Sequence, residues 1–294
     1  MVAVVELSSG PGTTAAYARA ALGLVPGFAP RGGTLPDVEL RQRGVTADLA
    51  HLSAYDRVCG FRLTDTLPAT YPHVLAFPLA MRLMTAPDFP LPLIGLVHIQ
   101  NRITMGRPIP SGAALDLAVR AEALRDHPRG RQFDVVATAA IDGTEVWRGV
   151  STYLRLGPRT AGAPVNRSSG DSAAATVDGG SLWRVPERVG TDYAAVSGDR
   201  NPIHTSRLGA RLFGFPRPIA HGMWSKARAL AALEGRLPDA FTVDVAFRKP
   251  VLLPGRATFT ATPADGGWTF ALTSRHPHLT GTVTPAPPPT AGRT

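Results

Sequence analysis

The chain has 294 residues, 44% of them hydrophobic, which is enough to bury one large core or two ordinary ones. Its formal charge of +9 comes from scattered arginines and only two lysines, Lys226 and Lys249, a pattern that does not predict a nucleic-acid interface. The single cysteine, Cys59, excludes an internal disulfide and a cysteine-cluster metal site.

No apolar run is long enough to span a bilayer, and no basic stretch precedes the first apolar residues of the chain. We therefore expect no membrane span, no secretory signal and a cytoplasmic protein. The positive charge favours anionic small molecules or an acidic carrier protein as partners through long-range attraction.

The sequence pattern of each half predicts a short turn segment, then a central helix, then a run of strands. The expected strands of the first half alternate in hydrophobicity and lie at residues 115–121, 133–139 and 146–153. In the second half, Gly222 to Leu233 has small and apolar residues at helical spacing, and strands follow at 242–247, 257–262 and 268–273. One helix followed by antiparallel strands is typical of an α+β fold.

The two halves resemble each other in sequence, which predicts an internal repeat. Three matches keep the same order: 55–61 with 193–199 at an offset of 138, 71–80 with 215–224 at 144, and 95–102 with 241–248 at 146. We therefore expect an N-terminal domain over residues 1–156 and a C-terminal domain over residues 186–284. Residues 157–185 are expected to be a linker, because the stretch from Gly157 to about Gly180 is rich in Gly, Ala, Ser and Pro, and the proline-rich tail 285–294 is not expected to join a sheet.

A polar turn in the second half carries the chemistry. Asp199, Asn201 and His204 lie within six residues, beside Gly198 and Pro202. A carboxylate only accepts hydrogen bonds, whereas an imidazole accepts or donates, so Asp199 and His204 can jointly hold and polarise one water molecule. Asn201 can fix the turn or orient a reacting group. We expect no metal here, since Asp199, His204 and His221 do not have a known ligand spacing.

This turn and the later stretch Pro218-Ile-Ala-His-Gly-Met223 resemble the MaoC-like (R)-specific enoyl-thioester hydratases and 3-hydroxyacyl-thioester dehydratases. The resemblance implies a double hot dog, in which a curled antiparallel sheet wraps each of two helices. It also implies that Asp199 and His204 are the catalytic pair and that Gly222 donates the oxyanion-hole hydrogen bond. A glycine at a helix start suits that task, because the first backbone N–H groups are unpaired.

The resemblance also implies a reaction: reversible hydration of trans-2-enoyl thioesters, or dehydration of (R)-3-hydroxyacyl thioesters, by a hydro-lyase without a cofactor. The thioester is carried on coenzyme A or acyl carrier protein, and Arg217, Arg248 and Lys249 are candidates for binding the carrier phosphates. In the first copy Phe61 stands in place of Asp199, so that half is expected to shape the acyl-chain pocket.

The sequence leaves two other functions open, a hot-dog acyl-thioesterase and a binding module that does not turn its acyl thioester over. A homodimer is one assembly that we consider. The sequence does not predict the acyl chain length, the carrier, or the direction in which the reaction runs.

Overall fold

The structure is a computed structural model and describes residues 2–8, 33–93, 95–157 and 180–286. The first half contains, in chain order, β1 (Ala3–Glu6), β2 (Val38–Val45), α2 (Leu49–Cys59), α3 (Tyr71–Met84), β3 (Leu96–Met105), β4 (Leu115–His127), β5 (Gly130–Ile141) and β6 (Thr144–Leu156). The second half contains β7 (Ser181–Val185), α4 (Val189–Ser197), α5 (Pro202–Thr205), α6 (Arg207–Leu212), α7 (Gly222–Ala232), β8 (Phe241–Phe247), β9 (Gly255–Ala264), β10 (Gly267–Thr273) and β11 (Pro277–Pro285).

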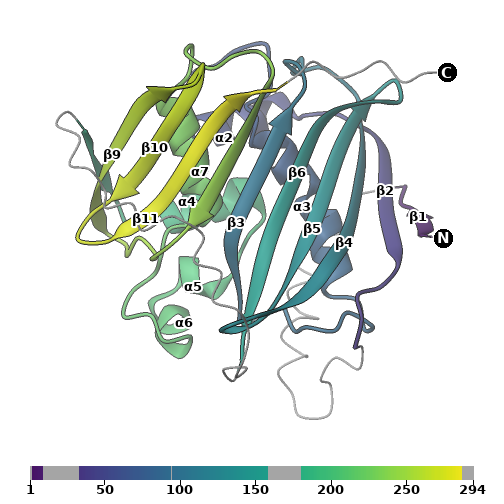
Figure 1. Cartoon of the computed structure of the whole chain (residues 1–294), viewed down its shortest axis with the longest axis horizontal. Coiled ribbons are helices and arrows are strands. Elements are labelled where there is room, and N and C mark those ends of the chain that lie inside the picture. Colours follow the sequence, from purple (N-terminus) through teal and green to yellow (C-terminus); the bar gives the residue numbers. More distant parts are fainter. Residues whose placement is uncertain (1, 9–32, 94, 158–179, 287–294) are drawn as a thin grey trace.

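All of these strands form one sheet, in the order β1-β2-β4-β5-β6-β3-β8-β11-β10-β9-β7 (Figure 1). The pairing is antiparallel throughout except between β1 and β2. At the centre, β3 of the first half pairs with β8 of the second, with Ile103 opposite Val243. The two halves are therefore joined by backbone hydrogen bonds into a continuous sheet.

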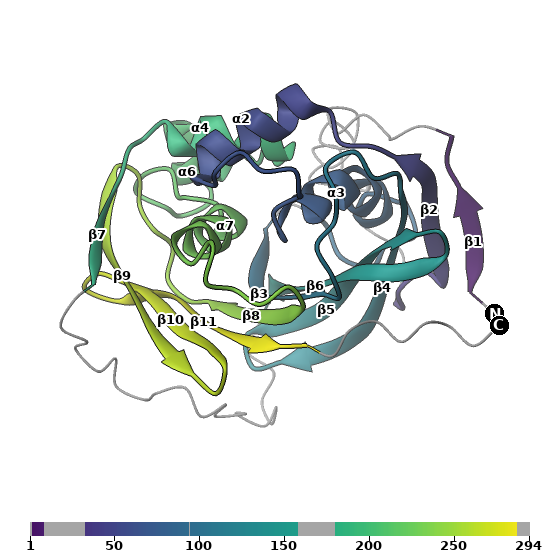
Figure 2. The same ribbon diagram turned by 90° about the horizontal axis from the view of Figure 1, so that it is seen from above.

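The sheet curls around two helices, α3 in the first half and α7 in the second (Figure 2). Ala227 and Ala229 of α7 have no exposed surface, and such small side chains let the sheet approach the helix closely. Leu79 and Leu83 of α3 are buried in the same way in the first half. The predicted double hot dog is confirmed, and α7 occupies the predicted helix apart from its last residue.

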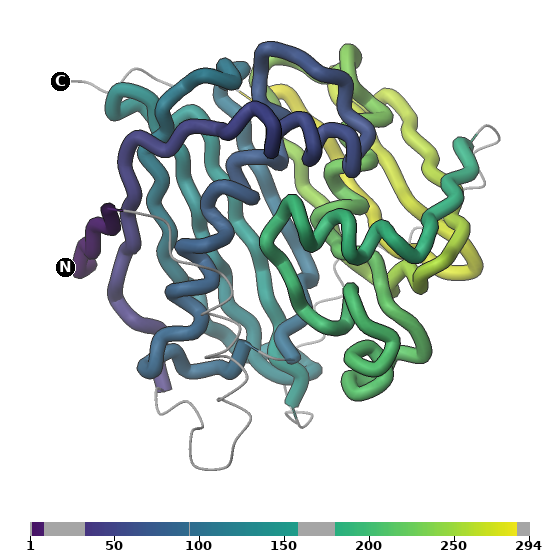
Figure 3. The backbone as a smooth tube through the Cα atoms, turned by 180° about the vertical axis from the view of Figure 1, so that it is seen from behind, coloured from purple at the N-terminus to yellow at the C-terminus, as the bar shows by residue number. Residues whose placement is uncertain are grey.

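Helices stand where short turn segments were expected. α2 and α4 run side by side behind the sheet (Figure 3), and the rings of Tyr55 and Tyr193 lie 6.3 Å apart. Each helix ends at a glycine in the left-handed region, Gly60 at φ 83° and Gly198 at φ 75°. The first sequence match therefore reflects a structural repeat, although the expectation of a turn alone was wrong.

The second sequence match is wrong in its register. α3 begins at Tyr71 and α7 at Gly222, which is 151 residues later rather than 144. The difference arises because the second copy has two short helices, α5 and α6, ahead of its central helix. The third match falls on β3 and β8, the pair at the centre of the sheet.

Two predicted boundaries also need correction. Residues 181–185 of the predicted linker form β7, which pairs with β9, while residues 158–179 lie outside the described part of the chain. Pro285 of the predicted tail is the last residue of β11 and lies opposite Phe241. A proline is tolerated there because it ends the strand. Residues 287–294 of the tail are likewise outside the described ranges.

Candidate active site

The turn after α4 holds its own side chains in place. The Asp199 carboxylate accepts a hydrogen bond from the backbone N–H of Asn201 at 3.2 Å. Asn201 caps α5, since its side-chain oxygen accepts from the N–H of Ile203 at 3.3 Å, and Pro202 follows as the first helical residue. The turn therefore fixes the position of His204. Asn201 has a structural role as a helix cap, and its contact with substrate stays a prediction.

His204 presents one nitrogen with a free lone pair. Its Nδ1 donates to the backbone carbonyl of Ile219 at 2.7 Å, and because a carbonyl only accepts, the proton of the neutral ring is on Nδ1. Burial lowers the pKa of His204 below its ordinary value, and Asp199 acts in the opposite direction. The ring is therefore neutral near pH 7, with Nε2 able to accept a proton.

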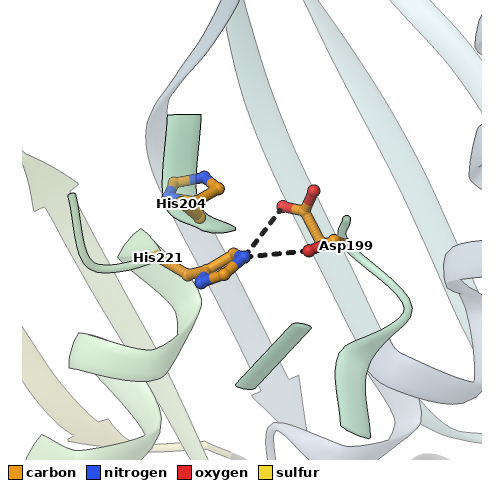
Figure 4. A group of neighbouring side chains, drawn as sticks. All are labelled: Asp199, His204 and His221. Atoms are coloured by element: carbon orange, nitrogen blue, oxygen red, sulfur yellow. Dashed lines mark hydrogen bonds and ion pairs between the residues drawn. The ribbon is translucent and has the colours of Figure 1, made fainter. Parts of the chain in front are cut away.

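His221 lies directly against His204, with ring centroids 3.7 Å apart and planes 25° from parallel (Figure 4). It is the residue before α7 and is only 2% exposed. Its Nε2 donates to the backbone carbonyl of Asp199 at 3.0 Å and lies 3.9 Å from the carboxylate Oδ2. Burial, then the neighbouring His204, lower the pKa of His221 to about 3. His221 therefore ties α7 to the Asp199 turn as a neutral ring.

Three groups converge at this point. A carboxylate oxygen of Asp199 and one ring nitrogen each of His204 and His221 all lie within 4.8 Å of one another. One water molecule spans such a gap with two hydrogen bonds of about 2.8 Å. A metal ion fits less well: lone pairs lie in the ring planes, and two stacked rings cannot both aim at one ion about 2.1 Å away. The geometry favours a shared water over a metal ion.

Gly222 begins α7 beside this group, so its N–H precedes the first hydrogen bond within the helix. The positive end of the helix dipole lies at the same place and favours an oxyanion. A Cβ atom on Gly222 would lie 3.0 Å from two carbons of the Phe247 ring. The position is therefore crowded for any side chain, and glycine leaves room for another group to approach the N–H.

Comparisons with known proteins assign the family. Residues 168–267 match the family described as MaoC like domain. The chain is 40% identical over 268 residues to 3-hydroxyacyl-thioester dehydratase X of Mycobacterium tuberculosis, an alignment that covers 90% of this chain and 95% of that protein. The chain belongs to the MaoC-like dehydratase family.

Solved structures agree with this family assignment. The crystal structure of HtdX from Mycobacterium tuberculosis matches with a TM-score of 0.74 at 39% identity, over 84% of this chain and 100% of that one. A MaoC-like dehydratase from Phytophthora capsici, at 17% identity and a TM-score of 0.68, shares the fold. The predicted family is thus confirmed, and with it the hydro-lyase class. Across the described ranges, no helix is long and apolar enough to cross a membrane.

The first half of this MaoC-like chain contributes residues that sequence reasoning missed. The Asp199 carboxylate acts electrostatically on His73 of α3, His98 of β3 and Tyr153 of β6. His98 stacks on Tyr153 at 4.7 Å and lies 4.9 Å from Phe247, the ring beside Gly222. Burial lowers the pKa of His73 to about 4 and that of His98 to about 3. Two neutral histidines of the first copy therefore lie near the Asp199 turn.

The first copy does not assemble the same group of side chains. Phe61 follows Gly60 where Asp199 follows Gly198, and its ring stacks on Tyr55. Tyr71 begins α3 where Gly222 begins α7. Thr66, which matches His204 without gaps, is not helical and pairs with Pro110. The differences leave one Asp-His-Gly constellation in the described part of the chain.

A pocket of about 430 Å³ lies on the surface of the second half. Two of the three predicted phosphate-binding residues, Arg217 and Lys249, line it, together with Arg256, His276 and His278, which the sequence did not indicate. The exposed Arg248 is not among its lining residues.

The pocket is linked to the catalytic turn through the backbone. The N–H of Ala220 donates to the carbonyl of Val251 at 2.9 Å, and that of Leu253 donates to the carbonyl of Pro218 at 2.8 Å. The carbonyl of Ile219, within the same segment, orients His204. One segment therefore connects the basic pocket, His204 and the start of α7.

Proposed function

We propose that the chain catalyses the reversible hydration of trans-2-enoyl thioesters and the dehydration of (R)-3-hydroxyacyl thioesters, with one active site in its second half. The observation that carries the proposal is the separation of at most 4.8 Å between Asp199 and His204, beside the glycine that begins α7. The R configuration rests on the family resemblance.

In the hydration direction, Asp199 accepts a hydrogen bond from one O–H of the water and His204 Nε2 accepts the other. The water oxygen bonds to carbon 3 while its proton moves to Nε2, and the electrons of the double bond move toward the thioester oxygen. The Gly222 N–H donates to that oxygen, where the enolate charge develops. The proton then passes to carbon 2 as the enolate returns to a thioester. Dehydration follows the same steps in reverse.

We place the carrier phosphates at the pocket that Arg217 and Lys249 line. Arginine and lysine suit phosphate oxygens, and the pocket is connected to Gly222 through residues 218–220. Coenzyme A and the phosphopantetheine arm of acyl carrier protein both present phosphate, so the pocket favours neither. An activity series on both carriers separates them.

The first test follows the loss of enoyl-thioester absorbance with crotonyl and longer enoyl thioesters on either carrier. We expect hydration by the wild type and a loss of about 10²–10⁴-fold in Asp199→Asn and in His204→Gln, with the fold retained. Two partly exposed positions supply matched controls, Asp192→Asn for the first variant and His127→Gln for the second, and both should keep wild-type turnover. Near-normal activity in Asp199→Asn or His204→Gln would refute the roles proposed here.

The same assay separates the two other functions. A thioesterase releases a free thiol, which a thiol reagent detects, and a binding module leaves the enoyl thioester unchanged in a tight complex. Release of thiol without loss of the double bond would replace the hydratase proposal.

A further inference from the structure

Lys226 of α7 is fully buried, with no exposed surface, although it carries an ionisable group. Its Nζ donates to three oxygens: the backbone carbonyl of Asn101 at 3.0 Å, the side-chain Oδ1 of Asn101 at 2.6 Å and the backbone carbonyl of Val243 at 3.1 Å. Buried lysines are rare unless their charge is paired, so this one calls for an explanation.

Three oxygen partners are the number that a protonated lysine side chain can donate to. A protonated lysine has three N–H groups, whereas a neutral amine has only two, and would direct its lone pair at a carbonyl oxygen. Burial lowers the pKa of Lys226 well below its ordinary range, Asp244 raises it, and Arg102 lowers it. Since Arg102 and Asp244 form an ion pair with each other, the direct partners of the ammonium are carbonyl dipoles.

The position of this cation relates it to the proposed oxyanion site. Lys226 is four residues after Gly222 on the same helix, which is about one turn or ~6 Å along the axis. Its two partner strands, β3 and β8, form the central pair that joins the halves. Asn101 also donates to Ser151 Oγ of β6 at 3.0 Å, so the network extends into the first copy.

We propose that Lys226 is a positioning residue whose buried charge stabilises the enolate at the Gly222 N–H and holds the start of α7 against the first copy. The proposal rests on the function proposed above. In hydration the thioester oxygen gains negative charge only as carbon 3 is attacked, so a fixed cation nearby lowers the barrier more than it strengthens substrate binding. A unit charge ~8 Å away in an effective dielectric of ~20 is expected to raise turnover roughly 10- to 30-fold.

The same charge also acts on the first copy. Burial is the main cause of the lowered pKa of His73 and of His98, and Lys226 lowers both further. It thereby helps to keep those two rings neutral. This effect follows from the position of the ammonium and needs no contact with substrate.

The test uses two variants that remove the charge differently. Lys226→Gln keeps a neutral N–H donor, and Lys226→Met with Asn101→Leu replaces both side chains by apolar ones, which avoids leaving the Asn101 amide oxygen without a partner. Ser151→Ala is the matched control, because it removes a hydrogen bond of the same network and keeps the charge. Circular dichroism checks that each variant is folded.

Two measurements distinguish an electrostatic effect from a structural one. We expect kcat for crotonyl thioester to fall roughly 10- to 30-fold in both charge-removing variants, with KM changed less than about threefold, and Ser151→Ala to stay near wild type. The second is the ultraviolet band of a bound 2,4-dienoyl thioester, which moves to longer wavelength as its carbonyl is polarised. This displacement should shrink in the charge-removing variants and persist in Ser151→Ala.

The outcomes separate this inference from the proposed function. If the wild type hydrates enoyl thioesters and the charge-removing variants match it in kcat and in the dienoyl band, the role of Lys226 is refuted and the proposed function stands. If the wild type neither binds nor hydrates an enoyl thioester on either carrier, the proposed function is refuted, and the role of Lys226 is refuted with it.

Discussion

Gly222→Ala is the substitution for which the expected effects on the free energy of unfolding and on turnover differ most clearly. An added Cβ would lie 3.0 Å from the Cδ1 and Cε1 atoms of Phe247 and 3.2 Å from Cγ, so the ring must move by a few tenths of an ångström. Overpacking of this kind costs about 1–3 kcal/mol, while alanine in place of glycine in a helix stabilises by up to ~1 kcal/mol. Because the gain can be close to zero, the free energy of unfolding should fall by no more than about 3 kcal/mol.

The effect on turnover should be larger. The new methyl group lies beside the N–H that is proposed to bind the thioester oxygen, and loss of one oxyanion-hole donor costs about 10²–10³ in kcat. The assay is the initial rate of crotonyl-thioester hydration, measured together with urea unfolding of the same preparation. We expect a folded protein with kcat reduced about 10²–10³-fold.

A double variant identifies the cause of the loss. Gly222→Ala with Phe247→Leu gives the methyl group room, so the ring no longer needs to move. If the methyl group blocks the N–H, the double variant stays inactive, and if the displaced ring was responsible, activity returns. Turnover within threefold of wild type in Gly222→Ala alone would refute the assignment of the oxyanion hole.

Three further predictions concern the carrier pocket and pH. Arg217→Ala and Lys249→Ala should each raise KM for the carrier-bound substrate about 3- to 30-fold with little change in kcat, and an unchanged KM would remove the pocket from the carrier site. Because the pKa of His204 is lowered, kcat/KM should stay constant as pH falls through ~6.5 and decrease only below it; a half-loss at ~6.5 would contradict a buried neutral base. His221 has a pKa of about 3 when folded and ~6.5 when unfolded, so the unfolded state binds the proton first. The stability that His221 contributes is complete above pH ~6.5 and is lost as pH falls toward 3. The urea midpoint should therefore be lower at pH 5 than at pH 7. An equal midpoint would argue against the burial of His221 as a neutral ring.

The candidate site could be predicted from the sequence because the residues that mark it act on the backbone next to them. Gly198, Asn201 and Pro202 are residues that end one helix and begin another, and each does so in the structure. Gly222 begins α7 for the same kind of reason, since Pro216 and Pro218 precede it and proline is disfavoured inside a helix. Local backbone chemistry therefore located both ends of the constellation.

What the sequence could not predict depends on distant parts of the chain. His98 faces the site because the register of β3 against β6 shifts between His98 and Gln100, and nothing near these residues marks that bulge. β7 directly follows a stretch of linker composition and is only five residues long, and it is held in the sheet by pairing with the distant β9. Lys226 is buried because two strands from different halves supply its acceptors, whereas a lysine in a helix ordinarily indicates an exposed face.

The register of the repeat failed for a related reason. The helices α5 and α6 are present only in the second copy, and they move the start of α7 away from the position that the sequence match gave. Short helices of four and six residues have too few turns to show a periodicity. The match at an offset of 144 therefore aligned residues that are not structurally equivalent.

The most direct measurement of the central claim uses an enoyl thioester in water enriched in ¹⁸O, with the products examined by mass spectrometry. We expect the wild type to place the label on carbon 3 of an intact thioester, and Asp199→Asn and His204→Gln to lose this incorporation together. Label in a free carboxylate, or equal incorporation by the wild type and both variants, would contradict it.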